Sequence, residues 1–311
     1  MDVRLVDMPT ERFGAWRAAT VARLAALRAD SGLRPPAEAA EQAEGIVAAR
    51  LPDGVRSADQ HLLEIRDGDR VTGSVWLEVR STPSHAMLYA LEADDAEIGS
   101  AALALVEERA RAHGARTLRI DLFAQDRAGW AMTERRGYRA TDIQMVLAPL
   151  PAPRAHGPLR LTPMTPAQYA AFEERVVAEF ADDLVAEGLH TPASARAESE
   201  RQQAEAMPDG LATEGALVFR ATVDGVAVGA LWLEVRQRST GPHVFVMELH
   251  VEPEHRRRGH GAAMMRAAED VARGVGADSI GLHVFGSNAA ARALYLGLGY
   301  REVETLLAAE L

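Results

Sequence analysis

His243-Val-Phe-Val-Met-Glu-Leu-His-Val251 is followed, after Pro253, by Arg256-Arg-Arg-Gly-His-Gly261. The first run alternates and is largely apolar, which predicts a β-strand that ends before the proline. Apolar residues then recur at helical spacing, at Met264, Ala268, Val271 and Val275. The glycines therefore fall at a helix start, where unpaired backbone N–H groups and the helix dipole form an anion site. Because glycine allows close approach and arginine adds charge-assisted hydrogen bonds, the stretch predicts a pyrophosphate-binding loop.

The residues around this loop resemble a known family. Arg256-x-x-Gly259-x-Gly261 after an apolar strand resembles the acetyl-CoA loop of the GNAT superfamily of N-acetyltransferases. The superfamily's next strand and helix are similar to Leu282-x-Val284-x-x-x-Asn288-x-x-Ala291-x-x-Leu294-Tyr295-x-x-x-Gly299-Tyr300. The loop motif alone is weakly specific, but these features follow in order and at the right spacings. The resemblance implies a mixed α/β fold, with a central, twisted, mostly antiparallel sheet flanked by helices.

Length and composition describe a globular protein. The 311 residues are enough for two domains with cores of their own. A hydrophobic share of 48% with 25% charged residues excludes a disordered chain. The net charge of −11 argues against a general nucleic-acid binder, because such a protein needs a basic field. We therefore expect no nucleic-acid partner, and we interpret the arginine triplet as a local positive site.

The chain has no cysteine, which excludes a disulfide framework, a thiolate nucleophile and a cysteine-ligated metal. The N-terminus lacks a signal-peptide pattern, and no apolar stretch approaches the length of a membrane span. We expect a cytoplasmic monomer or homodimer with no membrane partner and no metal cofactor.

A tandem repeat organises the chain. Gly73-Ser-Val-Trp-Leu-Glu-Val-Arg80 recurs as Gly229-Ala-Leu-Trp-Leu-Glu-Val-Arg236, an offset of 156 residues (229 − 73). Gly114-Ala115 recurs as Gly276-Ala277, an offset of 162 residues (276 − 114). Two copies of one domain explain these correspondences, with six residues gained between the third strand and the second long helix of the second copy.

A proline-rich run marks the boundary between the copies. Residues 149–158 have no periodic pattern and predict a semi-rigid connector. We predict a first GNAT-like domain over residues 1–150, a linker over 151–158 and a second GNAT-like domain over 159–311. Each begins with a short strand and helices, for which we expect Glu11–Arg28 in the first copy and Pro166–Glu187 in the second.

The first copy has lost the phosphate-binding residues. Alignment on the shared Gly-Ala pair sets Asp94–Glu97 opposite Arg256–Gly259, and only Gly99 survives, opposite Gly261. Two like charges about 4 Å apart repel by roughly 4 kcal/mol at an effective dielectric constant near 20. Asp126 and Thr133 stand opposite the asparagine and tyrosine of the second copy. We interpret the first domain as a degenerate copy kept for structure; the alternative is that it binds another ligand.

Acetyl transfer to an amine needs a base for the amine, donors for the thioester carbonyl and an acid for the departing thiolate. The resemblance implies that backbone N–H groups near Leu249 and Val251 hold the carbonyl. Glu248 is the candidate base, or else an exposed strand carboxylate. His250 lies on the same predicted strand face and could share or replace that role. His283 on the neighbouring strand is a weaker third candidate, and is otherwise structural.

Tyr295 is the candidate general acid, or else a packing residue. A phenol giving its proton to a thiolate is uphill by roughly 2 kcal/mol. Asn288 could bond the pantetheine arm, cap the helix that carries Tyr295, or do both. The predicted coenzyme contacts are Leu249, Val251, Arg256, Arg257, Arg258, Gly259, His260, Gly261, Asn288 and Ala291.

The acceptor is predicted from charge alone. Acidic residues mark the helix expected to cover the cleft, namely Glu179, Asp182, Asp183 and Glu187. They favour a cationic small-molecule amine. We therefore predict an acetyl-CoA-dependent N-acetyltransferase whose second domain is catalytic; the alternative is a non-catalytic protein that binds acetyl-CoA to sense or sequester a ligand.

Overall fold

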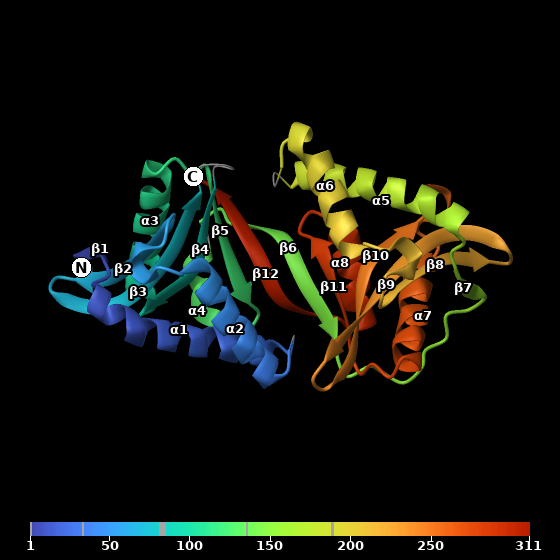
Figure 1. Ribbon diagram of the computed structural model, residues 1–311, viewed down its shortest axis with the longest axis horizontal. Helices are drawn as coiled ribbons and strands as arrows, with labels where there is room; N and C mark the ends of the chain where they lie inside the picture. Colours follow the sequence, from blue (N-terminus) through green and yellow to red (C-terminus); the bar gives the residue numbers. More distant parts are fainter. Residues whose placement is uncertain (1, 33, 81–84, 135, 188–189) are drawn as a thin grey trace. The chain divides into compact units, whose positions relative to one another are not determined.

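The computed structural model describes residues 2–32, 34–80, 85–134, 136–187 and 190–311 (Figure 1). Contacts between residues divide the chain into two compact units. The first comprises Met1–Ile143 and Val303–Leu311, and the second comprises Gln144–Glu302. Both are built from a sheet and helices, so the chain has the predicted mixed α/β class.

The first unit has the strand order β1-β2-β3-β4-β5-β12, in which the β4–β5 pair is parallel and the β1–β2, β2–β3, β3–β4 and β5–β12 pairs are antiparallel. The strands are β1 (Val3–Asp7), β2 (Gln60–Asp67), β3 (Arg70–Arg80), β4 (His85–Ala93), β5 (Thr117–Phe123) and β12 (Arg301–Glu310). The helices are α1 (Thr10–Ser31), α2 (Pro36–Arg50), α3 (Ala96–Ala112) and α4 (Arg127–Thr133), with a 3-10 turn at Gly54–Arg56.

The second unit has the corresponding order β6-β11-β10-β9-β8-β7, and its β10–β11 pair is parallel. The strands are β6 (Arg139–Leu147), β7 (Leu159–Pro163), β8 (Ala216–Val223), β9 (Val226–Arg238), β10 (Gly241–Val251) and β11 (Ile280–Phe285). The helices are α5 (Pro166–Ala186), α6 (Pro192–Ala206), α7 (His260–Gly274) and α8 (Ala289–Leu298), with 3-10 turns at Gly210–Ala212 and Pro253–His255.

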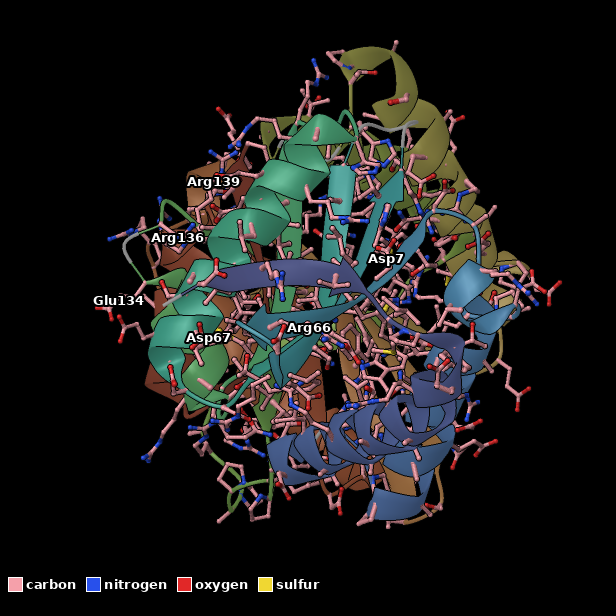
Figure 2. All side chains as sticks on the ribbon, turned by 90° about the vertical axis from the view of Figure 1, so that its left-hand side faces the viewer. Asp7, Arg66, Asp67, Glu134, Arg136 and Arg139 are labelled. Carbon is pink, nitrogen blue, oxygen red and sulfur yellow. The ribbon has the colours of Figure 1, made fainter. Side chains whose placement is uncertain are left out.

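Helices cover both faces of the sheet in the first unit. One apolar cluster joins α1 and α2 to the sheet, and includes an edge-on contact of the Trp16 and Trp76 rings at 5.9 Å. A second cluster lies between α3 and the opposite face. Asp7 at the end of β1 accepts a hydrogen bond from Arg109 on α3 at 3.0 Å, which holds the edge strand against that helix (Figure 2).

The second unit repeats this packing around its own tryptophan. The Trp232 ring meets the Phe172 ring of α5 edge-on at 6.5 Å within an apolar cluster. Helix α5 begins as predicted, with Pro166 as the first helical residue. The Thr165 side chain accepts a hydrogen bond from the Gln168 backbone, and the Gln168 side chain accepts one from the Thr165 backbone. The β8–β9 hairpin turns at Asp224 and Gly225, both with positive φ.

The two halves exchange their last strands, which corrects the predicted domain boundaries. Strand β12 pairs with β5 of the first unit, from Glu304 opposite Phe123 to Glu310 opposite Thr117. Residues 144–147 of β6 belong to the second unit, where β6 neighbours β11. The sequence division at residues 150 and 159 missed this exchange, because β6 and β12 are equivalent strands of the repeat.

The proline-rich linker packs on the second unit. Arg154 donates to both carboxylate oxygens of Glu269 on α7, at 3.2 and 2.5 Å, and to the Leu298 carbonyl at 3.0 Å. The Glu269 side chain is fully buried. Arg273 also donates to the Pro151 carbonyl at 3.0 Å. The linker is therefore a docked segment that neutralises a buried charge.

Candidate functional site

Strand β10 changes its pairing at its midpoint. A β-bulge at Met247 separates the pairs Val246 with Leu233 and Glu248 with Trp232 on β9. Pairing with β11 covers only Val244 to Val246. Within the part of the chain that the structure describes, the backbone N–H and C=O groups of β10 after Val246 therefore form no ladder hydrogen bonds with β11. The end of β10 therefore splays away from β11 after Val246.

The bulge also changes which side chains share a face. Met247 packs in the apolar cluster beneath α5, whereas Leu249 and Val251 lie about 4 Å from where a side chain on Gly261 would begin. Contrary to the strict alternation expected for this strand, Met247 therefore does not share the face of Leu249 and Val251, because the extra residue of a bulge breaks the alternation. Glu248 and His250 do share a face, as predicted, and it is the face that meets α5.

The predicted phosphate loop joins β10 to α7. Arg256, Arg257 and Arg258 are exposed, and none has an ion pair with a residue that the structure describes. The Arg256 Nε donates to the Val251 carbonyl at 2.9 Å. Gly259 caps α7 with φ +83°, and Arg257 has φ +61°. The left-handed backbone favours glycine at position 259 and strains Arg257. Three exposed cationic residues thus directly precede the glycine that caps a helix.

Gly261 brings this loop close to α8. A Cβ atom at Gly261 would lie 3.2 Å from the Leu294 Cδ2, closer than ordinary contact. Tyr295 follows Leu294 on the same helix. The glycine therefore sets the approach of the loop to the helix that carries the candidate acid.

Glu248 faces an arginine and further carboxylates of α5. Arg175 Nη1 lies 3.6 Å from Glu248 Oε1 and 2.7 Å from Glu179 Oε2. Burial raises the pKa of Glu248 to about 7; Arg175 opposes that rise, while the charges of Glu179 and Asp183 add to it. A carboxyl group with this pKa exchanges protons near neutral pH, as a general base must.

His250 adds an imidazole to the same cluster. Its side chain is only 7% exposed, with Nδ1 3.4 Å from Glu179 and Nε2 3.5 Å from Glu252. Single ligand atoms of Glu179, Glu248 and His250 lie within 4.8 Å of one another, so the structure brings both candidate bases together. These atoms could also ligate a divalent cation, but the Arg175 guanidinium already supplies positive charge beside them.

Tyr295 is buried on α8, and its pKa is raised above the ordinary value, first by burial and then by the charge of Glu248. Asn288 caps this helix by accepting from the Ala291 backbone at 3.0 Å, so the capping role expected for it is observed. His283 is exposed on β11, and its ring lies 5.4 Å from Phe245.

Sequence reasoning missed Arg175. It lies four residues before Glu179 on α5, a spacing that is typical of a solvated ion pair on a helix surface. The only sequence signal is its position among the buried residues of the apolar face, between Phe172 and Val176. Its approach to Glu248 depends on how α5 packs across the sheet.

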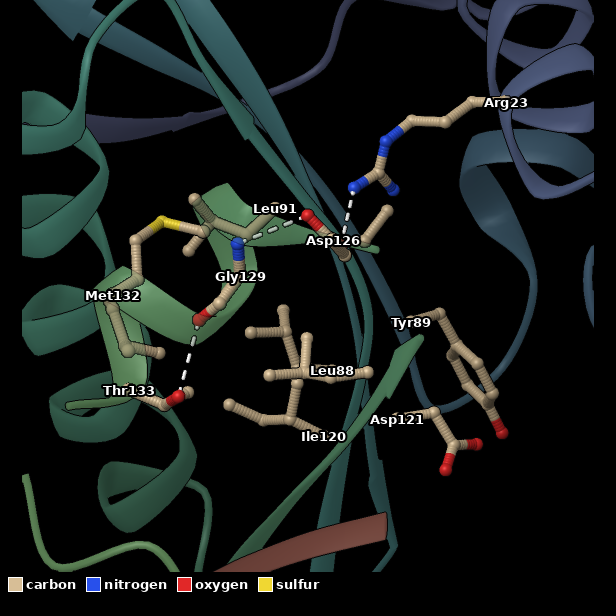
Figure 3. A pocket seen from close by; sticks show the side chains of 13 residues that line it. Arg23, Leu88, Tyr89, Leu91, Ile120, Asp121, Asp126, Gly129, Met132 and Thr133 are labelled. Carbon is tan, nitrogen blue, oxygen red and sulfur yellow. Dashed lines mark hydrogen bonds and ion pairs between the residues drawn. The ribbon is translucent and has the colours of Figure 1, made fainter. Parts of the chain in front are cut away.

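The first unit has the same strand geometry with different side chains. A bulge at Tyr89 puts Ala90 opposite Trp76, where the second unit has Glu248 opposite Trp232. A cavity of about 30 Å³ lies beside the splayed end of β4, with the Arg23–Asp126 ion pair of 3.1 Å along its wall (Figure 3). Such a cavity has room for only one or two water molecules. Among its lining residues is Thr133, whose hydroxyl donates to the Gly129 carbonyl at 3.2 Å.

The loop after β4 is shorter than the phosphate loop. Pairing with Gly73 and Gly229 makes Ala93 equivalent to Val251, an offset of 158 residues (251 − 93). Gly99 faces α4 as Gly261 faces α8, an offset of 162 residues (261 − 99). Four of the six residues gained by the second copy therefore lie in the phosphate loop.

The acidic residues of the first copy have other roles. Asp95 caps α3 by accepting from the Ile98 backbone at 2.8 Å, and Asp94 pairs with Arg70 at 2.6 Å. These residues stand opposite the arginines in the shorter loop of the first copy, but they cap α3 and pair with Arg70. The contrast between a carboxylate and an open glycine at the two helix starts remains.

Within the described ranges, every helix is too short or too polar to cross a bilayer.

Comparison with known proteins identifies relatives of the second half and of the whole chain. A model of the acetyltransferase (GNAT) family matches residues 178–300. The chain is 30% identical over 155 residues to the uncharacterized N-acetyltransferase YdgE of Bacillus subtilis (strain 168), covering 47% of this chain and 97% of YdgE. It is 24% identical over 154 residues to the uncharacterized N-acetyltransferase YycN of the same strain, covering 49% and 99%. A GCN5-related N-acetyltransferase structure from Sphaerobacter thermophilus shares the fold, with a TM-score of 0.54 at 18% identity, covering 99% of this chain and 95% of that one.

Proposed function

The chain belongs to the GNAT family of acetyltransferases, enzymes that use acetyl-CoA, and we propose that its second unit transfers the acetyl group to a primary amine of a small molecule. One observation carries the proposal. Glu248, with a pKa of about 7, lies on the splayed strand beside a buried tyrosine, and that strand leads into an arginine-rich helix start.

The loop fits the anionic part of acetyl-CoA. The exposed guanidinium groups of Arg256, Arg257 and Arg258 and the backbone N–H groups from Gly259 to Gly261 would bind its phosphates. The open edge of β10 near Leu249 and Val251 would donate to the thioester carbonyl. Asn288 and Ala291, at the start of α8, would contact the pantetheine arm. The bound coenzyme supplies an activated acetyl group and a thiolate that leaves.

Glu248 acts as the base in this proposal. An amine must lose a proton before its nitrogen can attack, and the carboxylate at the bulge accepts that proton directly or through a water molecule. His250 contacts Glu179 and can pass the proton onward.

Tyr295 acts as the acid. Its raised pKa keeps the phenol protonated at neutral pH. The raised pKa also makes proton transfer to a thiolate more unfavourable in free energy than it is between free groups. The charge of Glu248 contributes to that rise. Because Glu248 loses its charge when it accepts the proton of the amine, the phenol becomes a stronger acid during the step that needs it.

The acceptor is cationic in our proposal. Glu179 and Asp183 on α5 face Glu248, and Glu252 lies 3.5 Å from His250. A field of carboxylates attracts an ammonium group and repels an anionic acceptor.

The first unit has no catalytic role in our proposal. Ala90 provides no base and Thr133 no phenol, and its loop lacks the arginine turn. It completes the fold by accepting β12.

Release of CoA thiol from acetyl-CoA, measured over a panel of amino acids, polyamines and aminoglycosides, tests the proposed function. We expect turnover with at least one cationic amine and its loss in Glu248→Gln and Tyr295→Phe. Binding of acetyl-CoA without turnover on any amine would instead favour the non-catalytic ligand-binding protein.

A further inference from the structure

Arg175 is placed to act on Glu248. We infer that Arg175 is a positioning residue of the reaction: its guanidinium holds the Glu248 carboxylate in its charged form and in one orientation against α5. The inference rests on the proposed function, because it concerns the base of that reaction.

The guanidinium of Arg175 is itself held in place. It donates to Glu179 at 2.7 Å and lies 5.3 Å from the centre of the Phe172 ring, and its side chain is only 24% exposed. Its Nη2 is buried and has no hydrogen-bond partner within the described residues. A buried donor without a partner is costly, so this nitrogen is available to a carboxylate or to an acceptor molecule.

The charges around Glu248 make the protonation state of its carboxyl group depend on Arg175. From α5 it faces Arg175, Glu179 and Asp183, and from α8 it faces the neutral phenol of Tyr295. Its own strand adds His250, and Glu252 follows that strand beside His250. Among these groups, Arg175 supplies the positive charge that lowers the pKa of Glu248. Without it, a partly buried carboxylate would face other carboxylates and would stay protonated at neutral pH.

The pH dependence of kcat/KM tests the inference with the cationic amine that gives turnover. In Arg175→Gln, the acid limb of the profile should shift to higher pH by about one unit, as expected for loss of an opposite charge within a few ångströms. Activity near pH 7 should fall by about fivefold and recover at higher pH. A merely structural role would lower activity equally at every pH.

Matched variants control for charge and for folding. Arg196 on α6 also pairs with a glutamate four residues later, but it is far more exposed, so Arg196→Gln should leave the acid limb in place. Glu179→Gln removes a negative charge and should shift the acid limb to lower pH. Arg175→Lys keeps the positive charge and should retain the wild-type limb, and it provides a folded variant if the glutamine does not fold.

A second measurement needs no acceptor. In protein with ¹³C-labelled glutamate carboxyl groups, the resonance lost in Glu248→Gln reports the titration of this side chain. Its midpoint should rise in Arg175→Gln and fall in Glu179→Gln. An unchanged midpoint in Arg175→Gln, or an equal shift in Arg196→Gln, overturns the inference. If the midpoints move as expected while no amine is acetylated, the proposed function fails, and only the effect of Arg175 on the titration of Glu248 stands.

Discussion

The two units share one scaffold and differ in a few side chains and one loop. Both have a bulged strand that splays from its parallel neighbour, at Tyr89 in the first and Met247 in the second. In the first unit, the Tyr89 hydroxyl donates to Glu78 at 2.7 Å and so belongs to a structural network. The second unit uses the same geometry to present Glu248. The bulge and the separation of the two parallel strands are therefore properties of the fold, whereas the chemistry depends on which residues lie at the bulge.

A carboxylate at equivalent positions of α3 and α7 shows the same divergence. Glu107 on α3 accepts from Arg136, labelled in Figure 2, and from the Tyr138 hydroxyl at 3.0 Å. Its equivalent, Glu269 on α7, is paired with Arg154 of the linker, and the Tyr300 hydroxyl nearby is buried without a hydrogen bond within the described residues. In the second copy the linker therefore supplies the arginine that pairs with this carboxylate, whereas the first copy supplies its own arginine.

The largest effect expected concerns the strand exchange. Residues 159–311 produced alone would lack the β6 residues Met145 and Val146, which are fully buried, and β12 would lack β5. Burial of each such side chain contributes about 1.5 to 3 kcal/mol, so we expect loss of cooperative unfolding in calorimetry. Residues 144–302, which match the compact second unit, should unfold at a higher temperature. Equal stability of the two fragments would contradict the exchange.

Making the second copy resemble the first should remove catalysis. We expect Glu248→Gln to lower kcat/KM by about 10²- to 10⁴-fold, the usual contribution of a general base. Glu234→Gln on the neighbouring strand, whose carboxylate pairs with Arg236, serves as the matched control and should retain activity. Full activity of Glu248→Gln would leave His250 as the base.

The linker contact should contribute measurably to stability. Arg154→Ala leaves Glu269 buried and unpaired, which we expect to cost roughly 3 kcal/mol in the free energy of unfolding, because breaking a buried ion pair is strongly destabilising. Arg136→Ala in the first unit should cost less, since both partners of that pair are partly exposed. Denaturant unfolding of the two variants measures both changes. Equal losses would show that the linker has no special role.

The two helix starts should respond differently to CoA. A saturating ligand at 100 times its Kd stabilises a protein by about 2.7 kcal/mol, and Arg257→Glu should abolish this stabilisation. Asp95→Ala should cost about 1 kcal/mol through loss of the helix cap, yet leave the shift caused by CoA unchanged. Thermal unfolding with and without CoA separates the two effects. If Asp95→Ala alone changes the CoA shift, the active and inactive copies have been assigned the wrong way round.

The smallest effect expected is the pH dependence near neutrality. Glu248 must be ionised to accept a proton and has a pKa of about 7, so kcat/KM should fall about twofold from high pH to pH 7 and tenfold by pH 6. Because this pKa is raised in the folded protein, the ionised carboxylate destabilises the fold, and stability is lost as pH rises through 7. Glu248→Gln should therefore unfold at a higher temperature than the wild type at pH 8. Absence of that gain would contradict the raised pKa.

Much of the second unit was predictable because its signals are local. The loop Arg256–Gly261 has its glycine at the start of α7, and Glu248 and His250 share a strand face, as their spacing predicts. The position of Met247 was not predictable, because the bulge depends on the register that β10 adopts against β9. The meeting of Arg175 with Glu248 was equally hidden, because it joins a helix to a strand far along the chain.

The tandem repeat, the mixed α/β class and the glycine-arginine loop follow from the amino-acid sequence alone, because periodicity, caps and turns are set by near neighbours in the chain. Which last strand completes each sheet depends on tertiary packing. Strands β6 and β12 occupy equivalent places in the repeat, so either pairing satisfies the same local pattern, and the choice follows from packing of the whole chain. The tertiary structure likewise decided that the Arg175 guanidinium lies beside Glu248, because charge complementarity at short range requires both elements to be in place.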